Sequence, residues 1–278
     1  LAVKSILAFH AHPDDEVMGT GVTLAKYSDE GVRTVVVTAT DGSEGEIRNY
    51  DDPEEIKPKL AEVRKKELEA SLESLGVSDY EWMGYKDSGM MGDDSNKDPE
   101  CFWQQDYFGP VGRLVHIIRK YQPEAIITYD PFGGYGHPDH IQANRIGTAA
   151  FFAMGDLDKF PLNPNEEFWI PERLYFTSWS KARIQARREQ MYKVGLISKD
   201  ELDKYKNIGN SDEDIDVEVD GKQYVQKKID AWKCHRTQLG DDWWAFNIPE
   251  EYRDDFLGVE SYITAFNRGR FNSKTQLL

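Results

Sequence analysis

The sequence has too little positive charge for a protein that binds nucleic acids. It holds 34 lysines and arginines against 50 aspartates and glutamates, which gives a net charge of −16. A nucleic-acid binder needs a basic surface that displaces counterions from phosphates, and attachment to anionic lipids needs one too. We therefore expect neither nucleic acid nor membrane among its partners, and we interpret the acidic excess as a solvated surface.

Cysteines and long apolar runs are also scarce. The two cysteines, Cys101 and Cys234, form no C-x-x-C motif, so a disulfide framework is not expected and a reducing cytoplasm is favoured. No apolar run reaches the roughly 18 residues of a membrane-spanning helix. The apolar part of residues 1–7 is shorter than a signal-peptide core, and we expect it to lead directly into the first strand. Because numbering begins at Leu1, we expect that a few residues precede it or were removed.

What the sequence does contain is a regular alternation of strand and helix patterns in its first half. Apolar, β-branched runs predict strands at 3–9, 33–39, 80–83 and 125–129. Amphipathic patterns predict helices at 17–30, 59–75 and 111–121, and another that begins at His137-Pro138. This alternation predicts an α/β, Rossmann-like fold with a mainly parallel sheet flanked by helices.

The pattern changes after about residue 155. Weaker signals predict strands at 174–179 and 261–266, helices at 182–194 and 224–239, and a hairpin in which 214–219 turns at Asp220-Gly221. A long loop is predicted at 84–110, and loops of that length are more often functional than idle. We expect a single domain over residues 1–278, with an α/β core at 1–155 and a C-terminal elaboration at 156–278 over the functional site.

Two clusters of potential metal ligands stand far apart in the sequence. His12, Asp14 and Asp15 follow the first predicted strand, and His137 and His140 follow the fourth. Ligands bind beyond the carboxyl ends of strands in open α/β sheets, so both clusters are expected at one edge of the sheet. Imidazole and carboxylate together suit zinc or another first-row divalent ion, and a carboxylate beside such an ion can act as general base. Metal-dependent hydrolysis is therefore the leading hypothesis.

The two motifs together resemble a known family. Residues 11–16 (Ala-His-Pro-Asp-Asp-Glu) and 134–140 (Gly-Tyr-Gly-His-Pro-Asp-His) are similar to the motifs of the LmbE-like (PIG-L) zinc N-deacetylases. The resemblance covers most of residues 4–150 and the His-Arg-Thr-Gln segment at 235–238. Within the family, the mycothiol branch looks most similar, with its N-acetylglucosaminyl-inositol deacetylase and its mycothiol S-conjugate amidase.

The resemblance implies a role for each matching residue and one Zn²⁺ per chain, with Fe²⁺ as the alternative. Asp14 matches the general base. His137 matches the imidazole that stabilises the tetrahedral intermediate or protonates the leaving amine, and Tyr135 matches the tyrosine that polarises the amide carbonyl. Of their charged neighbours, Asp139 is expected to cap the following helix and Glu16 to support the loop. The family's metal ligands match three residues: His12, Asp15 and His140.

The resemblance also implies contacts with substrate. Glu46, Arg64 and Asp87 match residues that contact sugar or inositol hydroxyls, and a polyol needs such paired donors and acceptors. The alternative for Arg64 and Asp87 is a surface ion pair. His235 either reaches the site from the late helix or packs and caps there.

These observations predict hydrolysis of an amide, with N-deacetylation of an N-acetylglucosamine conjugate such as GlcNAc-inositol as the first choice. Cleavage of a larger amide, as by the S-conjugate amidase, stays open because the C-terminal part resembles that enzyme equally well. Against it, the lysine that follows the first motif in that branch has no match in residues 17–20. A metal phosphoesterase or a carbohydrate-binding protein is the alternative from another class. The expected partner is a small amino-sugar conjugate, and a homo-oligomer is left open.

Overall fold

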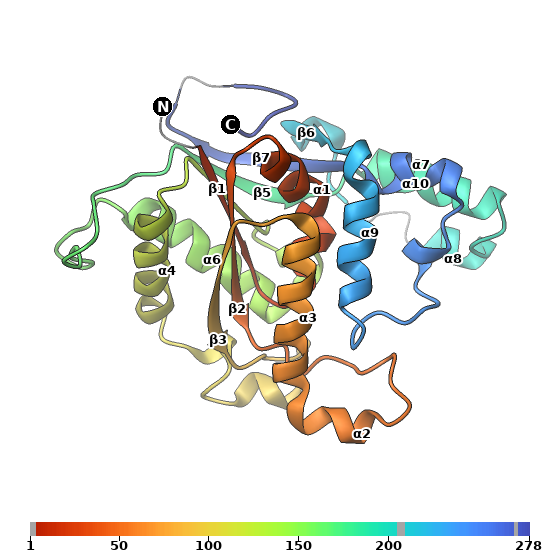
Figure 1. Ribbon diagram of the computed structural model, residues 1–278, viewed down its shortest axis with the longest axis horizontal. Helices are drawn as coiled ribbons and strands as arrows, with labels where there is room; N and C mark the ends of the chain where they lie inside the picture. The colour runs from red at the N-terminus through yellow and green to blue at the C-terminus, as the bar shows by residue number, and fades with distance from the viewer. Residues whose placement is uncertain (1–3, 205–208, 270–271) are drawn as a thin grey trace.

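One mixed sheet runs through the part of the chain that the structure describes, residues 4–204, 209–269 and 272–278 of a computed structural model (Figure 1). The strand order is β3-β2-β1-β4-β5-β7-β6. The pairs among β1 to β5 are parallel, whereas β7 is antiparallel to β5 and β6. The prediction of a mainly parallel sheet is confirmed; residue 3, expected in the first strand, lies outside the described residues. The strands are β1 (Ser5–His10), β2 (Arg33–Thr40), β3 (Asp79–Tyr85), β4 (Ala125–Thr128), β5 (Arg173–Ser178), β6 (Val217–Asp220) and β7 (Val259–Asn267).

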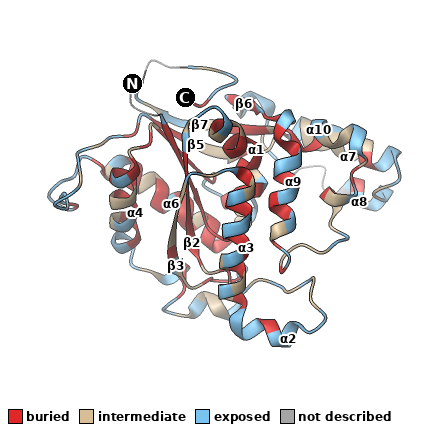
Figure 2. Cartoon of the chain, in the orientation of Figure 1, coloured by how far each residue is buried: buried red, intermediate tan, exposed pale blue. Residues whose placement is uncertain are grey.

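Helices cover both faces of the sheet because its central strands bury side chains on both sides. Every residue of β1 is buried, as its uninterrupted apolar run requires. Helices α1 (Asp15–Asp29), α3 (Leu60–Leu75) and α9 (Val225–Cys234) pack on one face, and α4 (Phe108–Tyr121) and α6 (Pro138–Ala153) pack on the other. Figure 2 shows buried residues on the strands and on the inward sides of these helices.

Shorter elements connect this framework. The remaining helices are α2 (Pro53–Ile56), α5 (Gly133–Gly136), α7 (Lys181–Lys193), α8 (Lys199–Lys204) and α10 (Glu250–Leu257). Turns of 3₁₀ helix lie at Lys57–Lys59, Asp94–Lys97, Phe102–Gln104, Asp212–Asp214, Lys222–Tyr224 and Trp244–Asn247. The segment 84–110, predicted as one loop, thus holds two of these turns, the end of β3 and the start of α4.

The predicted hairpin at Asp220-Gly221 is wrong. Strand β6 pairs with the distant β7, with Val217 opposite Tyr262, and no strand follows the turn directly. Gly221 donates its N–H to the Gly258 carbonyl at 2.8 Å, so the turn residues join β6 to a 3₁₀ turn and α9 instead. The helix predicted to run to residue 239 ends at Cys234.

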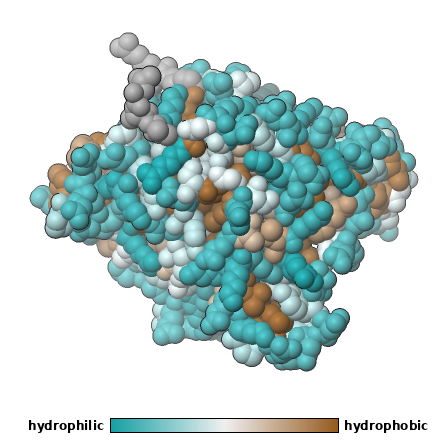
Figure 3. Space-filling view, in the orientation of Figure 1, coloured by the Kyte–Doolittle hydropathy of each residue, from teal (hydrophilic) through white to brown (hydrophobic). Residues whose placement is uncertain are grey.

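The order of the strands positions the functional residues. The chain runs outward from β1 to β3 on one side and from β4 to β5 on the other, so the connections reverse between β1 and β4. A crevice at such a switch point, beyond the carboxyl ends of the strands, is where open α/β sheets bind ligands. Both sequence motifs follow these two strands. The face in Figure 3 is mostly hydrophilic, with apolar residues in scattered patches, in keeping with the acidic composition. Across the described ranges, helices with the length and apolarity to cross a membrane are lacking.

Candidate metal centre and active site

Three of the predicted ligands meet in a tight triangle at the ends of β1 and β4. His12 Nδ1 lies 3.2 Å from His140 Nε2 and 3.2 Å from Asp15 Oδ2, and the last two atoms are 3.4 Å apart. Ligand atoms around a tetrahedral zinc with bonds of about 2.0–2.1 Å must be roughly 3.3 Å from one another. The donor types and their spacing therefore fit one divalent cation.

The other nitrogen of His12 faces a second group of carboxylates. His12 Nε2 lies 3.2 Å from Asp139 Oδ2 and 3.5 Å from Asp87 Oδ1. Asp139 in turn accepts hydrogen bonds from the backbone N–H of Ser88, at 2.9 Å, and from the Ser88 hydroxyl. A carboxylate that holds the far nitrogen of a ligating histidine fixes its tautomer and increases its basicity. Asp139 was expected to cap α6; its side chain instead orients His12.

Two other groupings, which share His12 with the triangle, could also hold an ion. One joins His12, His137 and His140, and the other joins His12, Asp87, His137 and Asp139, with one ligand atom of each within 4.8 Å of the others. The triangle with Asp15 has the shorter separations, all of 3.2–3.4 Å, and we regard it as the better fit.

The backbone that follows β4 fixes the orientation of His140. Its Nδ1 lies 3.1 Å from the carbonyl oxygen of Gly133, which leaves Nε2 to face the triangle. Gly133 has a φ of 68°, and a Cβ at this position would lie 2.6 Å from the His140 Cβ. Glycine is therefore needed here, both for the left-handed backbone and for the close approach.

Asp14 is held in an unusual conformation next to the triangle. Its φ is 118°, and Gln122 is the one other non-glycine residue with a positive φ in the described chain. The Asp14 N–H donates to Glu16 Oε2 at 2.9 Å, and Arg64 donates from Nη2 to Asp14 Oδ2 at 3.1 Å and to the Pro13 carbonyl. Such strain persists only where surrounding contacts fix it, and it is frequent at active sites.

The environment of Asp14 also changes its basicity. Desolvation raises the pKa of Asp14 to about 6 against the opposing charge of Arg64, and Asp15 raises it further. A carboxylate with this pKa is ionised at neutral pH yet accepts a proton more readily than an ordinary aspartate. These are the properties of a general base.

His137 presents a hydrogen-bond donor to the same crevice. It is the N-cap of α6, where its Nδ1 accepts the backbone N–H of Asp139 at 3.2 Å, so the ring proton of the neutral form is on Nε2. Burial, together with His12 and His140, lowers the pKa of His137 to about 3. The neighbouring Tyr135 is exposed, with its ring centroid 6.2 Å from that of His137.

A polar cleft of 590 Å³ opens above these groups. Three of the four residues predicted to contact substrate line it, namely Glu46, Arg64 and Asp87. Glu46 is exposed and accepts from Arg48 Nη2 at 2.7 Å, so it can exchange this partner for a substrate hydroxyl. The predicted catalytic residues line the same cleft: Asp14, Tyr135 and His137.

His235 does not line the cleft. Its side chain is fully buried beneath the first motif, with Nε2 2.7 Å from Glu16 Oε1. The same Glu16 oxygen accepts from the Ser71 hydroxyl at 2.6 Å, while the other accepts the Asp14 N–H. His235 thus supports the loop that carries Asp14 instead of contacting a ligand there.

A second cavity of 450 Å³ lies on the other side of the triangle. Asp15, His140 and Tyr135 form its boundary with the metal centre, and Met18, Phe132 and Trp179 make its wall largely apolar. The two cavities therefore adjoin at the metal centre, where both are lined by Asp15, Met18 and Tyr135.

An α/β sheet with a largely buried His₂Asp triangle at its switch point, beside a strained carboxylate of raised pKa, is an arrangement that suits a metal-dependent hydrolase. A family model described as GlcNAc-PI de-N-acetylase (PIG-L) matches residues 7–151, which include both motifs. The chain belongs to this family of deacetylases.

Curated relatives match nearly the whole chain. A 1D-myo-inositol 2-acetamido-2-deoxy-alpha-D-glucopyranoside deacetylase from Thermobifida fusca is 37% identical over 276 residues, covering 93% of this chain and 92% of the relative. An Acidothermus cellulolyticus protein of the same name is 36% identical over 272 residues, covering 94% and 88%.

Solved structures show the same fold at lower identity. The N,N'-diacetylchitobiose deacetylase from Pyrococcus horikoshii superposes with a TM-score of 0.64 at 23% identity, covering 95% of this chain and 84% of its own. A 4-carboxy-2-hydroxymuconate hydratase from Pseudomonas putida reaches 0.61 at 19% identity, covering 98% and 100%. Since a hydratase shares the fold, function has to be argued from the site.

Proposed function

We propose that the chain is a zinc-dependent N-deacetylase that removes acetate from an N-acetylglucosamine conjugate, with a GlcNAc-inositol as the leading substrate. The observation that carries this proposal is the triangle of His12, Asp15 and His140 with Asp14 beside it. The names of the full-length relatives support the same reaction and the same kind of substrate. The two free cysteines support a cytoplasmic location.

His12, Asp15 and His140 would hold the ion, and two imidazoles with one carboxylate suit Zn²⁺ first and Fe²⁺ second. When bound, the ion supplies a Lewis acid for the amide carbonyl and acidifies water. Asp14, oriented by Arg64, accepts the proton of the attacking water. The raised pKa of about 6 suits Asp14 to this step at neutral pH.

Two hydrogen-bond donors are available to the carbonyl oxygen, on the side away from Asp14. His137 and Tyr135 both line the cleft, and the Nε2–H of the neutral His137 and the Tyr135 hydroxyl can donate to the developing oxyanion. With its pKa at about 3, His137 is unsuited to deliver a proton at neutral pH. The proton that Asp14 has taken is therefore the one that passes to the leaving amine.

The polar cleft would bind the amine side of the amide. Glu46, Arg64 and Asp87 offer acceptors and a donor to ring hydroxyls. The apolar cavity on the acyl side far exceeds an acetyl group, which favours a second candidate function, cleavage of a larger acyl group as in an S-conjugate amidase.

Release of free amine from three substrates tests the proposal: N-acetylglucosamine, its inositol conjugate and a mycothiol S-conjugate, each with zinc-loaded and chelated enzyme. We expect chelator-sensitive release, fastest from the inositol conjugate. Asp14→Asn should lower kcat by about 10²–10⁴-fold while metal content stays at that of the wild type. Release that survives chelation, or an Asp14→Asn enzyme as fast as wild type, would contradict the mechanism.

A further inference from the structure

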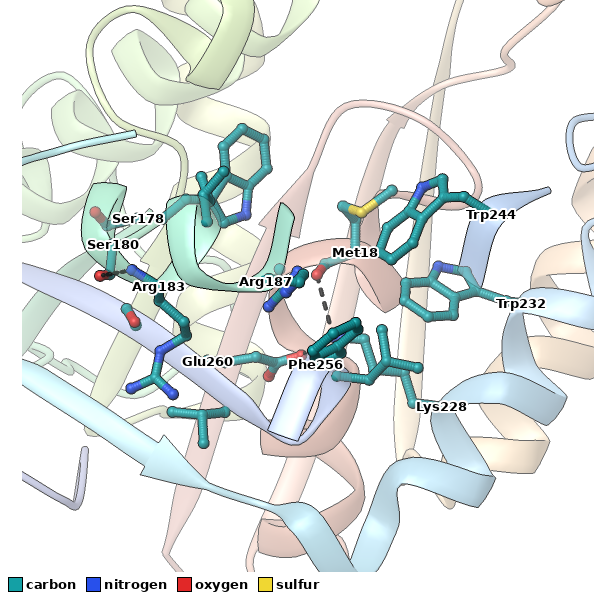
Figure 4. A pocket seen from close by; sticks show the side chains of 16 residues that line it. Met18, Ser178, Ser180, Arg183, Arg187, Lys228, Trp232, Trp244, Phe256 and Glu260 are labelled. Atoms are coloured by element: carbon teal, nitrogen blue, oxygen red, sulfur yellow. Dashed lines mark hydrogen bonds and ion pairs between the residues drawn. The ribbon is translucent and has the colours of Figure 1, made fainter. Parts of the chain in front are cut away.

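A small cavity outside the catalytic cleft lies where α7, α9, α10 and β7 meet. It encloses 70 Å³, room for a group of a few non-hydrogen atoms. Three basic side chains, Arg183, Arg187 and Lys228, line it together with aromatic rings (Figure 4). A cavity this basic stands out in a chain whose net charge is −16.

Two of the three cations are neutralised by the protein. Lys228 Nζ lies 2.6 Å from Glu260 Oε1, and both side chains are about 4% exposed. Arg183 Nη2 lies 2.6 Å from Glu218 Oε1. Glu260 is the one carboxylate that lines the cavity, and its charge is already matched by Lys228.

Arg187 has no such partner. Among the described residues its guanidinium forms no hydrogen bond or ion pair, and its Nε is buried without an acceptor. Figure 4 shows Arg187 among the side chains that line the cavity, and its Cζ lies 6.0 Å from the centroid of the Phe256 ring. Burial, and secondarily Arg183, lowers the pKa of Arg187 to about 10. Arg187 is half-buried, with its Nε shielded from solvent, and a cation in such a place loses hydration that an anion in the cavity would replace.

We propose that this cavity is a subsite for a carboxylate group, bound by Arg187. A guanidinium presents its N–H groups as a planar fork that matches a carboxylate. Trp232, Trp244 and Phe256 supply an apolar wall that lowers the local dielectric and accommodates the carbon atoms next to the carboxylate. The Ser178 hydroxyl accepts from Asn210 at 2.9 Å, so its own proton is available as a second donor.

The position of the subsite suggests two sources for the carboxylate. The small cavity and the 450 Å³ cavity at the metal centre share part of their walls, so the subsite lies next to the side of the metal centre that we assign to the acyl group. The carboxylate is then either the far end of the substrate's acyl group or a free small carboxylate; the first source rests on the proposed function and the second does not. The shared residues are Met18, Gly19, Ser178 and Trp179.

Binding of butyrate to the folded protein tests the subsite without any reaction. Butyrate should raise the melting temperature at constant ionic strength, and uncharged butyramide should not. In Arg187→Met the dissociation constant for butyrate should increase about tenfold or more, because a charge-assisted hydrogen bond is lost. The dissociation constant of Arg187→Lys should lie between those of wild type and Arg187→Met, because lysine keeps the positive charge but lacks the planar fork of N–H donors. Lys193→Met, at the exposed end of the same helix, is the matched control and should bind as wild type.

Kinetics then decide between the two sources. If the substrate carries the carboxylate, the ratio of kcat/KM for N-succinyl- over N-acetylglucosaminide falls about tenfold in Arg187→Met and is kept in Lys193→Met. If the ratio is unchanged but butyrate binding is lost, the ligand is a free carboxylate. Failure to hydrolyse either amide contradicts the proposed function and leaves the binding result standing.

The subsite is refuted if wild type and Arg187→Met bind butyrate equally, or not at all, and show the same acyl ratio. Equal binding would assign the butyrate to the metal centre, where a carboxylate can also bind.

Discussion

Replacing His235 with alanine should destabilise the fold far more than it weakens substrate binding. The imidazole is fully buried and lies 2.7 Å from Glu16 Oε1. Its removal leaves a buried carboxylate without a counter-charge, a change that typically costs about 3–5 kcal/mol. Glu16 retains hydrogen bonds from Ser71 and from the Asp14 N–H, so we expect the lower end of this range.

Urea unfolding followed by circular dichroism measures this loss. With a slope near 3 kcal/mol/M, a loss of about 3 kcal/mol moves the unfolding midpoint by roughly 1 M. His116 offers a matched control, because its Nδ1 lies 2.8 Å from Glu166 Oε1 but its side chain is 34% exposed. His116→Ala should therefore cost at most about 1 kcal/mol. In the double variant Glu16→Gln/His235→Ala the loss should be smaller than the sum of the single losses, because the unpaired charge is gone.

The pH dependence has a defined sign. Burial lowers the pKa of His235, but Glu16 outweighs it and raises this pKa above its ordinary value. The stabilisation is therefore complete below about pH 6.5, the pKa of an unfolded histidine, and decreases as the pH rises through the folded-state value. An unfolding midpoint within about 0.3 M of wild type, together with a tenfold rise in KM, would instead make His235 a substrate contact.

Three further variants test the metal centre and the strained base. His140→Ala should lose most bound zinc in elemental analysis; full occupancy would remove this residue from the ligands. Asp139→Asn should weaken zinc affinity about 10–100-fold in competition with a chelator, since it orients His12 from outside the triangle, and an unchanged affinity would deny that role. Asp14→Gly should be more stable than Asp14→Ala by about 1 kcal/mol in urea, because glycine relieves the φ of 118° that alanine keeps, and the reverse order would mean that the strain is absent.

The central strands and the catalytic motifs could be predicted because their signals are local. The apolar run of β1 and the β-branched run of β2 each indicate a strand buried on both faces, and each is one. Both histidine motifs follow strands, so the switch-point rule brings them together without knowledge of side-chain contacts. The pairing of β6 was harder to predict, because its partner β7 lies about forty residues away in the sequence. The Asp-Gly turn gave a stronger local signal, for a hairpin that does not form.

The supporting contacts could not be predicted because they join distant segments. Glu16 and His235 are separated by 219 residues, and no pattern within either segment indicates a pair. The side chain of Asp139 was predicted to cap the following helix, and in the structure it does not. Its carboxylate is turned toward His12 because His137 already accepts the N–H at the start of α6.

The strained conformation of Asp14 and the buried pair below it are parts of one arrangement. In an unstrained extended conformation, the Asp14 N–H would leave Glu16 and its carboxylate would leave Arg64. His235 contributes most to keeping Glu16 ionised in the core, and the hydrogen bonds from Ser71 and the Asp14 N–H add to it. Glu16 and Arg64 therefore each exclude an alternative conformation of Asp14 before substrate binds. The free energy of the strain then lowers the stability of the fold and does not add to the barrier of the reaction. Residues far from the amide, His235 among them, should consequently change kcat through Asp14 while KM stays nearly constant.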